Sequence, residues 1–309
     1  MIEIRHRFIL DPDPSDQGAE AALFVEHRAP AEVVGSHPVV LVHGGGGQGT
    51  DWGTTPDGRP GWADLLLADG WEVHVVDRPG HGRTPGRVPP PAALAMTARI
   101  FAPGDLVGHT QWPGPGGVDD PAVRVLATSA AGLPSDLAVA QSIEQRLLET
   151  LLEGIGPAVL VAHSLGACAA WLVAEHRPDL VAAVVAIEPA GPPYVDVPGT
   201  PLRLPAGITA APLGSEGRLT GLTQVPVAVV QGEASPMGAS TPPVVDYLRQ
   251  AGVHVDHIEL AAHGLHGNGH GLILELNNEA VLDVVLTWVT SAVPEADALS
   301  ARTGTGEDA

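Results

Sequence analysis

Short, unbroken apolar runs recur along the chain of 309 residues and are bounded by polar or turn-forming positions. Such runs are typical of parallel strands, because helices cover both faces of a parallel sheet. The predicted strands lie at 38–44, 71–77, 157–164, 180–188 and 225–233. Segments with helical periodicity alternate with them at 61–70, 136–156, 164–178, 242–252 and 277–293. This alternation predicts an α/β fold with a doubly wound, mostly parallel sheet.

Three further patterns depart from this alternation. Residues 2–10 and 21–30 alternate polar and apolar side chains around a turn-rich stretch, which predicts an antiparallel hairpin at the edge of the sheet. Residues 86–134 and 190–224 fit neither a strand nor a helix period. Long insertions in a compact fold commonly cover a binding site, so we expect these two segments to be lids.

Composition limits the domain organisation and the partners. With 309 residues, 44% of them hydrophobic, we expect one domain over 1–294. The tail over 295–309 lacks apolar periodicity, so we expect it to be disordered. The formal net charge of -21 disfavours nucleic acid and anionic membranes as partners. All 15 basic residues are arginines, and without lysine the chain lacks P-loop, Schiff-base and lysine general-base chemistry.

Cysteine usage and hydropathy bear on the compartment. Cys168 is the single cysteine, so the chain forms no internal disulfide. Neither an N-terminal signal pattern nor an apolar run long enough to span a membrane is visible. We therefore expect a cytoplasmic protein.

Ser164 stands between a predicted strand and a predicted helix in the segment VLVAHSLGACAAWLV. A serine in such a tight turn is strained and needs small neighbours, which Ala162 and Gly166 provide. The turn lifts the hydroxyl above the sheet, and the amide of Leu165 at the helix start can meet a developing oxyanion. We interpret Ser164 as a nucleophile, the alternative being an ordinary helix cap.

Four successive glycines, 44–47, follow the first predicted parallel strand. Glycine allows positive φ and lets backbone N–H groups approach a ligand, so we expect the amide of Gly45 or Gly46 to be the second oxyanion donor. A phosphate cradle is the alternative, but no G-K-[ST] follows. His43 and His163 lie beside the two motifs and are expected to be structural.

His263, His266 and His270 come after the last predicted strand. A general base should lie on a loop at the carboxyl edge of the sheet, just before the final helix, and His270 fits this position best. The spacing also resembles a metal site, but the intervening GNG interrupts a helix that would align the rings. We expect no metal and no cofactor, with His263 and His266 as solvated or supporting residues.

Glu188 ends a strongly apolar predicted strand and is followed by Pro189. A buried carboxylate needs a partner, and a serine–histidine pair needs an acid to orient the imidazole. We therefore assign Glu188 to His270 and expect an extended backbone there because of the proline. A salt bridge to an arginine such as Arg203 is the alternative.

In chain order, these features are the HGGGG loop, Ser164, Glu188 and His270. Over residues 20–292 the chain resembles the α/β-hydrolase superfamily. VVDRPGHGRT at 75–84 is similar to a turn of that superfamily, and 269–289 is similar to its terminal G-H with a closing helix. Many members carry the acid one strand later. Ser235 stands there in this chain, which leaves Glu233 as the second candidate acid.

Within the superfamily, the segments at 43–62 and 266–278 resemble a small group of atypical bacterial carboxylesterases. This resemblance implies a triad glutamate after the sixth strand, which corresponds to Glu188. It also implies that a homodimer is possible. Ala162 stands where those relatives carry glycine.

Together these features predict hydrolysis of a small-molecule carboxylic ester through an acyl-enzyme. A lactonase, thioesterase, amidase or C–C bond hydrolase could use the same residues, and a non-catalytic binding protein is the alternative from another class. Trp52, Trp112 and Tyr194 are candidate substrate contacts, although isolated aromatic residues commonly belong to the core.

Overall fold

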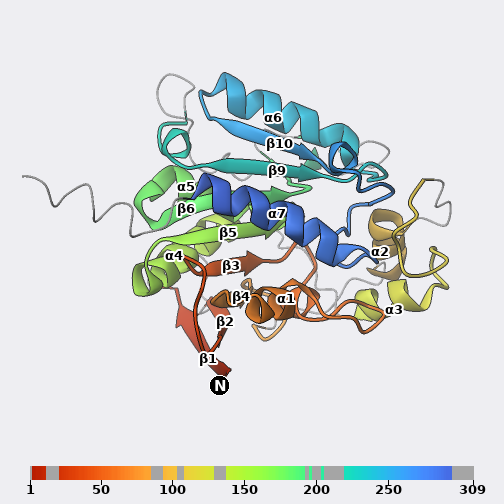
Figure 1. Cartoon of the computed structure of the whole chain (residues 1–309), viewed down its shortest axis with the longest axis horizontal. Coiled ribbons are helices and arrows are strands. Elements are labelled where there is room, and N and C mark those ends of the chain that lie inside the picture. The colour runs from red at the N-terminus through yellow and green to blue at the C-terminus, as the bar shows by residue number, and fades with distance from the viewer. Residues whose placement is uncertain are drawn as a thin grey trace, which may run out of the picture.

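The computed structural model describes residues 2–11, 21–84, 93–102, 108–128, 137–191, 195–196, 203–204 and 219–293. An eight-stranded sheet crosses the molecule (Figure 1). Its strands are β1 Glu3–Leu10, β2 Ala22–Ala29, β3 Val39–Val42, β4 Val73–Asp77, β5 Ala158–His163, β6 Val181–Ile187, β9 Val227–Gln231 and β10 Val255–Glu259. The spatial order is β1-β2-β4-β3-β5-β6-β9-β10. The β1–β2 and β2–β4 pairs are antiparallel and the others are parallel.

Helices cover both faces of this sheet. The α-helices are α1 Trp62–Ala68, α2 Ala93–Phe101, α3 Pro121–Thr128, α4 Leu137–Ile155, α5 Ala167–His176, α6 Thr241–Gln250 and α7 Asn278–Ala292. The 3-10 helices are η2 Gly49–Trp52, η3 Ser164–Gly166, η4 Pro178–Leu180, η6 Leu222–Gln224, η7 Gly238–Ser240 and η8 Leu260–His263. A separate two-stranded ribbon pairs β7 Val195–Asp196 with β8 Arg203–Leu204. None of the described helices combines the length and the apolar character that a membrane span requires.

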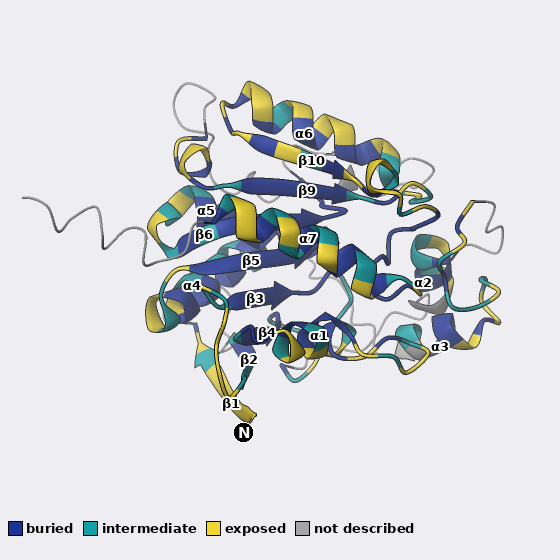
Figure 2. Cartoon of the chain, viewed as in Figure 1, coloured by how far each residue is buried: buried dark blue, intermediate teal, exposed yellow. Residues whose placement is uncertain are grey.

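Each buried strand divides its side chains between two cores. Along β3, Val39 and Leu41 belong to the core that includes residues of α1 and α7, whereas Val40 and Val42 belong to the core that includes residues of α4, α5 and α6. This is the two-residue alternation of a strand, here apolar on both faces. Figure 2 shows the central strands buried along most of their length. The predicted doubly wound α/β sheet and its antiparallel N-terminal edge are confirmed.

One strand of the main sheet, two α-helices and the β7–β8 ribbon were not predicted from the sequence. Strand β10 was not predicted because only Val255 and Ile258 of its five residues are buried, so it lacks an unbroken apolar run. Helices α2 and α3 lie inside the segment 86–134, where frequent proline and glycine obscure a helical period. Most of 190–224 and the whole tail from 294 lie outside the described residues.

Candidate active site

Ser164 lies in a strained turn at the carboxyl end of β5. Its φ is +52°, and only one other described non-glycine residue, Glu188, has a positive φ. The chain passes closely over β3 here, because a Cβ at Gly166 would lie 2.4 Å from the carbonyl oxygen of His43. Glycine is therefore required at 166, and the turn presents the Ser164 hydroxyl at the edge of the sheet.

His270 brings its imidazole to that hydroxyl. Its Nε2 lies 3.1 Å from Ser164 Oγ, and its side chain is almost fully buried. The Nε2–H of His163 donates to the backbone carbonyl oxygen of His270 at 2.9 Å, which fixes the backbone of this loop. Phe101 at the end of α2 packs against the His270 ring.

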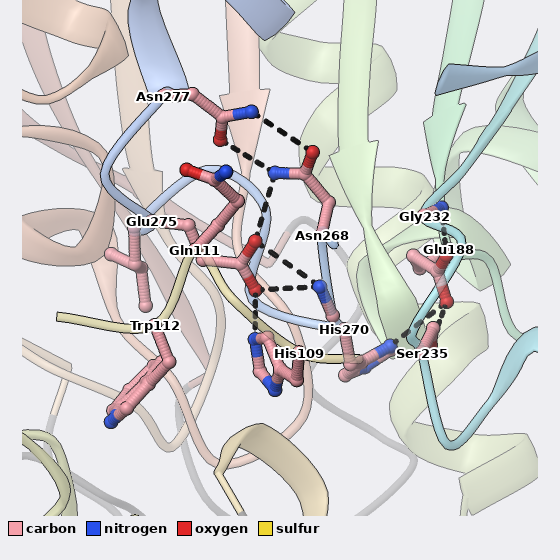
Figure 3. Close-up of polar contacts among 12 residues, drawn as sticks. His109, Gln111, Trp112, Glu188, Gly232, Ser235, Asn268, His270, Glu275 and Asn277 are labelled. Carbon is pink, nitrogen blue, oxygen red and sulfur yellow. Dashed lines mark hydrogen bonds and ion pairs between the residues drawn. The ribbon is translucent and has the colours of Figure 1, made fainter. Parts of the chain in front are cut away.

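Glu188 completes a line of three polar side chains. Its Oε2 lies 3.4 Å from His270 Nδ1 and accepts from Ser235 Oγ at 2.5 Å (Figure 3). Its Oε1 accepts from the amide of Gly232 at 2.6 Å. The carboxylate is completely buried yet fully partnered, which is the condition for keeping a buried anion.

The backbone at Glu188 differs from our expectation. An extended conformation was predicted from Pro189, but φ is +47°, in the left-handed region. The Glu188 amide still donates to Val230 on β9, and the amide of Ala190 donates to the Ser164 carbonyl at 3.0 Å. The chain must therefore turn sharply right after β6, and these hydrogen bonds outweigh the local preference that proline imposes.

Glu233, the second candidate acid, lies elsewhere. Its carboxylate is half exposed and meets His266 Nδ1 at 3.2 Å and the amide of Gly267 at 3.1 Å. His263 is also exposed. The geometry thus joins His270 to Glu188, while the side chain of Arg203, the alternative partner, is outside the described residues.

The glycine loop after β3 faces Ser164. Gly46 has a φ of +72°, and a Cβ on Gly44 would lie 3.2 Å from Ser164 Cβ. Neither Gly45 nor Gly46 donates its amide to an acceptor among the described residues. Both amides, together with the Leu165 amide at the start of the helical segment, are thus candidates for an oxyanion site.

The buried ion pair between Arg78 and Glu144 stabilises the glycine loop. Arg78 donates to both carboxylate oxygens of Glu144 at 2.9 and 3.0 Å, and also to the carbonyl oxygens of His43 and Gly44. Both bonds to the carboxylate come from Nη2, while Nη1 donates to the two carbonyls, so the guanidinium connects α4 to the glycine loop. Sequence reasoning missed this support, because Glu144 lies in the middle of α4 and no local pattern connects it to the loop.

Two neutral histidines and one acid flank the site. Burial lowers the pKa of His43 well below its usual value and lowers the pKa of His163 to about 3. Consistent with a neutral ring, His43 donates from Nδ1 to Gly44 and accepts at Nε2 from the amide of Arg78. Asp51 borders the same region, and burial raises its pKa to about 7.

Glu275 organises the loop that carries His270. Its buried carboxylate accepts from the amide of Gly269 at 2.9 Å, from Asn268 Nδ2 at 2.9 Å and meets His109 Nε2 at 2.9 Å. Asn268 and Asn277 also exchange two side-chain hydrogen bonds (Figure 3). The sequence did not identify this network, although Asn268 and Glu275 both lie in the segment 266–278 that resembles the atypical carboxylesterases.

Two of the three predicted aromatic contacts, Trp52 and Trp112, lie in the described part of the chain, and both are buried. Trp52 is completely buried and packs against Trp62 in the core, and its role as a substrate contact stays a prediction. Trp112 is also buried, with its indole N–H bound to Asp120 at 2.7 Å. Tyr194 lies outside the described residues.

A small cavity of about 20 Å³ adjoins the glycine loop. Its lining includes Gly44, Gly45, Asp51, Phe101 and Leu274. The space is enough for about one water molecule. Phe101, Ile273 and Leu274 form its apolar side, and sequence reasoning did not select them.

Comparisons with known proteins agree with this architecture. A family model described as alpha/beta hydrolase fold matches residues 37–210. A curated relative from Fungal sp. (strain ATCC 74256), named probable secreted lipase phiG, is 32% identical over 86% of this chain and 85% of its own.

Solved structures share the fold. One described as a novel bacterial esterase has a TM-score of 0.67 at 24% identity, over 95% of each chain. A hyperthermophilic esterase from the archaeon Pyrobaculum calidifontis has a TM-score of 0.51 at 17% identity, over 94% of this chain and 87% of its own. The family match and the sequence relative show that this chain belongs to the α/β-hydrolase fold family.

Proposed function

We propose that this protein is a serine esterase that hydrolyses small-molecule carboxylic esters. The observation that carries the proposal is the hydrogen-bonded line from Ser164 through His270 to Glu188, which is buried at His270 and begins at a strained serine. Relatives named as a lipase and as esterases support the same reaction class.

In the acylation half, His270 Nε2 takes the Ser164 proton while Oγ bonds to the ester carbonyl carbon. The resulting oxyanion receives hydrogen bonds from the amides of Leu165 and of Gly45 or Gly46. The carbon–oxygen bond to the alcohol then breaks, and His270 gives its proton to the departing oxygen. The products of this half are the free alcohol and an ester on Ser164.

In the deacylation half, His270 takes a proton from water while the water oxygen attacks the acyl carbon. The bond to Ser164 Oγ breaks, and the proton passes from His270 to that oxygen. Glu188 remains ionised throughout, orients the ring and stabilises the imidazolium that forms twice per cycle. The enzyme returns to its starting state with no cofactor consumed.

Labelling of the purified full chain with a fluorophosphonate probe tests the nucleophile. Wild type should be labelled at Ser164, and Ser164→Ala should lose both the label and about 10⁶-fold in kcat toward p-nitrophenyl esters. Absence of labelling in the folded wild type would favour a non-catalytic binding protein. Full turnover by Ser164→Ala would identify another nucleophile.

A second assay separates esters from the other acyl substrates. Matched ester, thioester, lactone and amide substrates with one acyl group should give the highest kcat/KM for the ester. A series of p-nitrophenyl esters of increasing acyl bulk then measures the space beside Phe101. Higher kcat/KM for a thioester or lactone would reassign the reaction while leaving the acyl-enzyme mechanism intact.

A further inference from the structure

A second group of metal-ligating side chains lies on the sheet, away from Ser164. It consists of His27 on β2, Glu72 just before β4 and His74 on β4, which we call the His27–His74 cluster. One donor atom from each residue lies within 4.8 Å of the other two. We propose that this cluster binds a divalent transition-metal ion such as Zn²⁺, which would tie β2 to β4.

Strand pairing builds the cluster. His27 and His74 are direct partners in the antiparallel register, so their side chains leave the sheet on the same face. Their rings stack with centroids 4.6 Å apart and planes 9° from parallel. Glu72 precedes His74 by two positions, and in extended chain such residues point to the same face.

The donor distances suit a small metal ion. His27 Nε2 lies 2.8 Å and His74 Nε2 lies 3.5 Å from the same oxygen, Glu72 Oε1. Zinc binds nitrogen and oxygen at about 2.0–2.2 Å, which separates tetrahedral donors by roughly 3.4 Å. Small rotations of the three side chains are enough to surround an ion, and water can take the fourth position.

His74 supplies an independent observation. Its side chain is 3% exposed, yet neither ring nitrogen has a hydrogen-bond partner among the described residues. Buried polar atoms are rarely left unpartnered, because desolvation without a new bond is unfavourable. An ion on Nε2 satisfies one of these two atoms.

Access and charge also fit. The side chains of Glu72 and His27 are 32% and 21% exposed, so an ion from solvent meets them before it reaches His74. The Glu72 carboxylate, 3.5 Å from His74 Nε2, supplies the negative charge at the cluster. Two imidazoles with one carboxylate favour zinc and its transition-metal neighbours over Mg²⁺ or Ca²⁺.

The site is structural rather than catalytic. His74 is the second residue of β4, whereas the active site lies beyond the carboxyl ends of the parallel strands. An ion here would hold the antiparallel edge, β1 and β2, to the parallel part of the sheet through β4. Its effect should therefore appear in stability, with little change in kcat.

Metal titration of the untagged, EDTA-treated full chain tests the proposal. One Zn²⁺ ion per chain should bind at the cluster, and binding should raise Tm. Bound Co²⁺ should give the visible absorption of a four-coordinate site. Mg²⁺ at the same concentration should raise Tm far less. His27→Ala and Glu72→Gln should each weaken Zn²⁺ binding by at least about tenfold.

His266→Ala is the matched control, because His266 is an exposed histidine that also contacts a glutamate. This variant should keep the wild-type zinc response. Glu72→Gln is the gentler of the two cluster variants and serves if His27→Ala fails to fold. An unchanged Tm with Zn²⁺, an equal response to Mg²⁺, or wild-type zinc affinity in the folded cluster variants would overturn the proposal.

Discussion

Glu188 and Glu233 have different surroundings, which predict different roles. Glu188 is buried and contacts His270, whereas Glu233 is half exposed and contacts His266. Glu188→Ala should lower kcat by about 10⁴-fold, because the imidazolium loses its counter-ion and the ring its orientation. Glu233→Ala should keep kcat near wild type. Steady-state ester hydrolysis measures kcat for both variants. A severe loss of kcat only in Glu233→Ala would contradict the assignment of Glu188.

Ser235 is a positioning residue for Glu188. Its hydroxyl donates to the carboxylate oxygen that also faces His270. A hydrogen bond to a charged group contributes about 1.5–3 kcal/mol, so Ser235→Ala should lower kcat by about tenfold or more. Without the Ser235 hydroxyl, the Glu188 carboxylate should stabilise the His270 imidazolium more strongly. The acidic limb of the kcat/KM profile should therefore move to higher pH.

Ser235→Thr is the conservative control, since it keeps the hydroxyl. Recovery of both kcat and the acidic limb is expected. An unshifted pH profile in Ser235→Ala, with kcat lowered only in proportion to folded protein, would indicate a merely structural hydroxyl.

The turn at Ser164 could be predicted from the sequence, whereas the contact between Ser235 and Glu188 could not. The sequence of small residues around Ser164 predicted its tight turn, because sterics there are local. The bond from Ser235 to Glu188 was not predicted, because it joins the ends of two different strands. From the sequence, Ser235 was noted only because it stands where many superfamily members carry the triad acid.

At the scale of elements, Glu275 connects the loop of His270 to the segment at His109. Glu275→Gln replaces a buried anion, which accepts several N–H groups, by an amide that presents two donors of its own. We expect a loss of about 1–3 kcal/mol in unfolding free energy, a lower Tm and a lower kcat.

Glu279→Gln is the matched control for this prediction. Glu279 is an exposed glutamate in the first turn of α7, four residues away in the chain. Thermal unfolding and ester hydrolysis of the two variants should differ clearly. Equal Tm values would show that the Glu275 network does not stabilise the fold.

Elements were predicted well where one periodicity dominated. The apolar runs of β3, β5 and β6 are buried on both faces, so their sequence alone identifies them. Strand β10 buries only Val255 and Ile258, three positions apart, so it shows neither the unbroken apolar run of a core strand nor the strict alternation of an edge strand. The His27–His74 pairing depends on the register between β2 and β4, which periodicity does not specify.

At the scale of the whole molecule, the alternation of strands and helices predicted where distant residues meet. Parallel strands end at one edge, so Ser164 after β5 and Glu188 after β6 had to be neighbours. The contacts below that edge, such as Arg78 with Glu144, required the packed helix α4. The dimer and the cytoplasmic location stay predictions.

Buried neutral histidines should make the molecule sensitive to mild acid. Burial lowers the pKa of His43 far below 6.5, that of His81 to about 4 and that of His163 to about 3. Between these values and 6.5 the unfolded chain binds more protons, so the unfolding free energy falls as pH falls. Each ring contributes up to about 1.4 kcal/mol per pH unit. Asp51, with its pKa raised to about 7, acts in the opposite direction.

Urea unfolding at pH 7, 6 and 5 measures this dependence, and the window lies above the range in which ordinary carboxylates titrate. The unfolding free energy should decrease steadily from pH 7 to pH 5. His81→Asn keeps a donor toward Pro79 but removes one titrating ring, so its slope should be smaller by up to about 1.4 kcal/mol per pH unit. A flat profile in wild type, or the same slope in His81→Asn, would show that these rings are protonated or hydrated in the folded state.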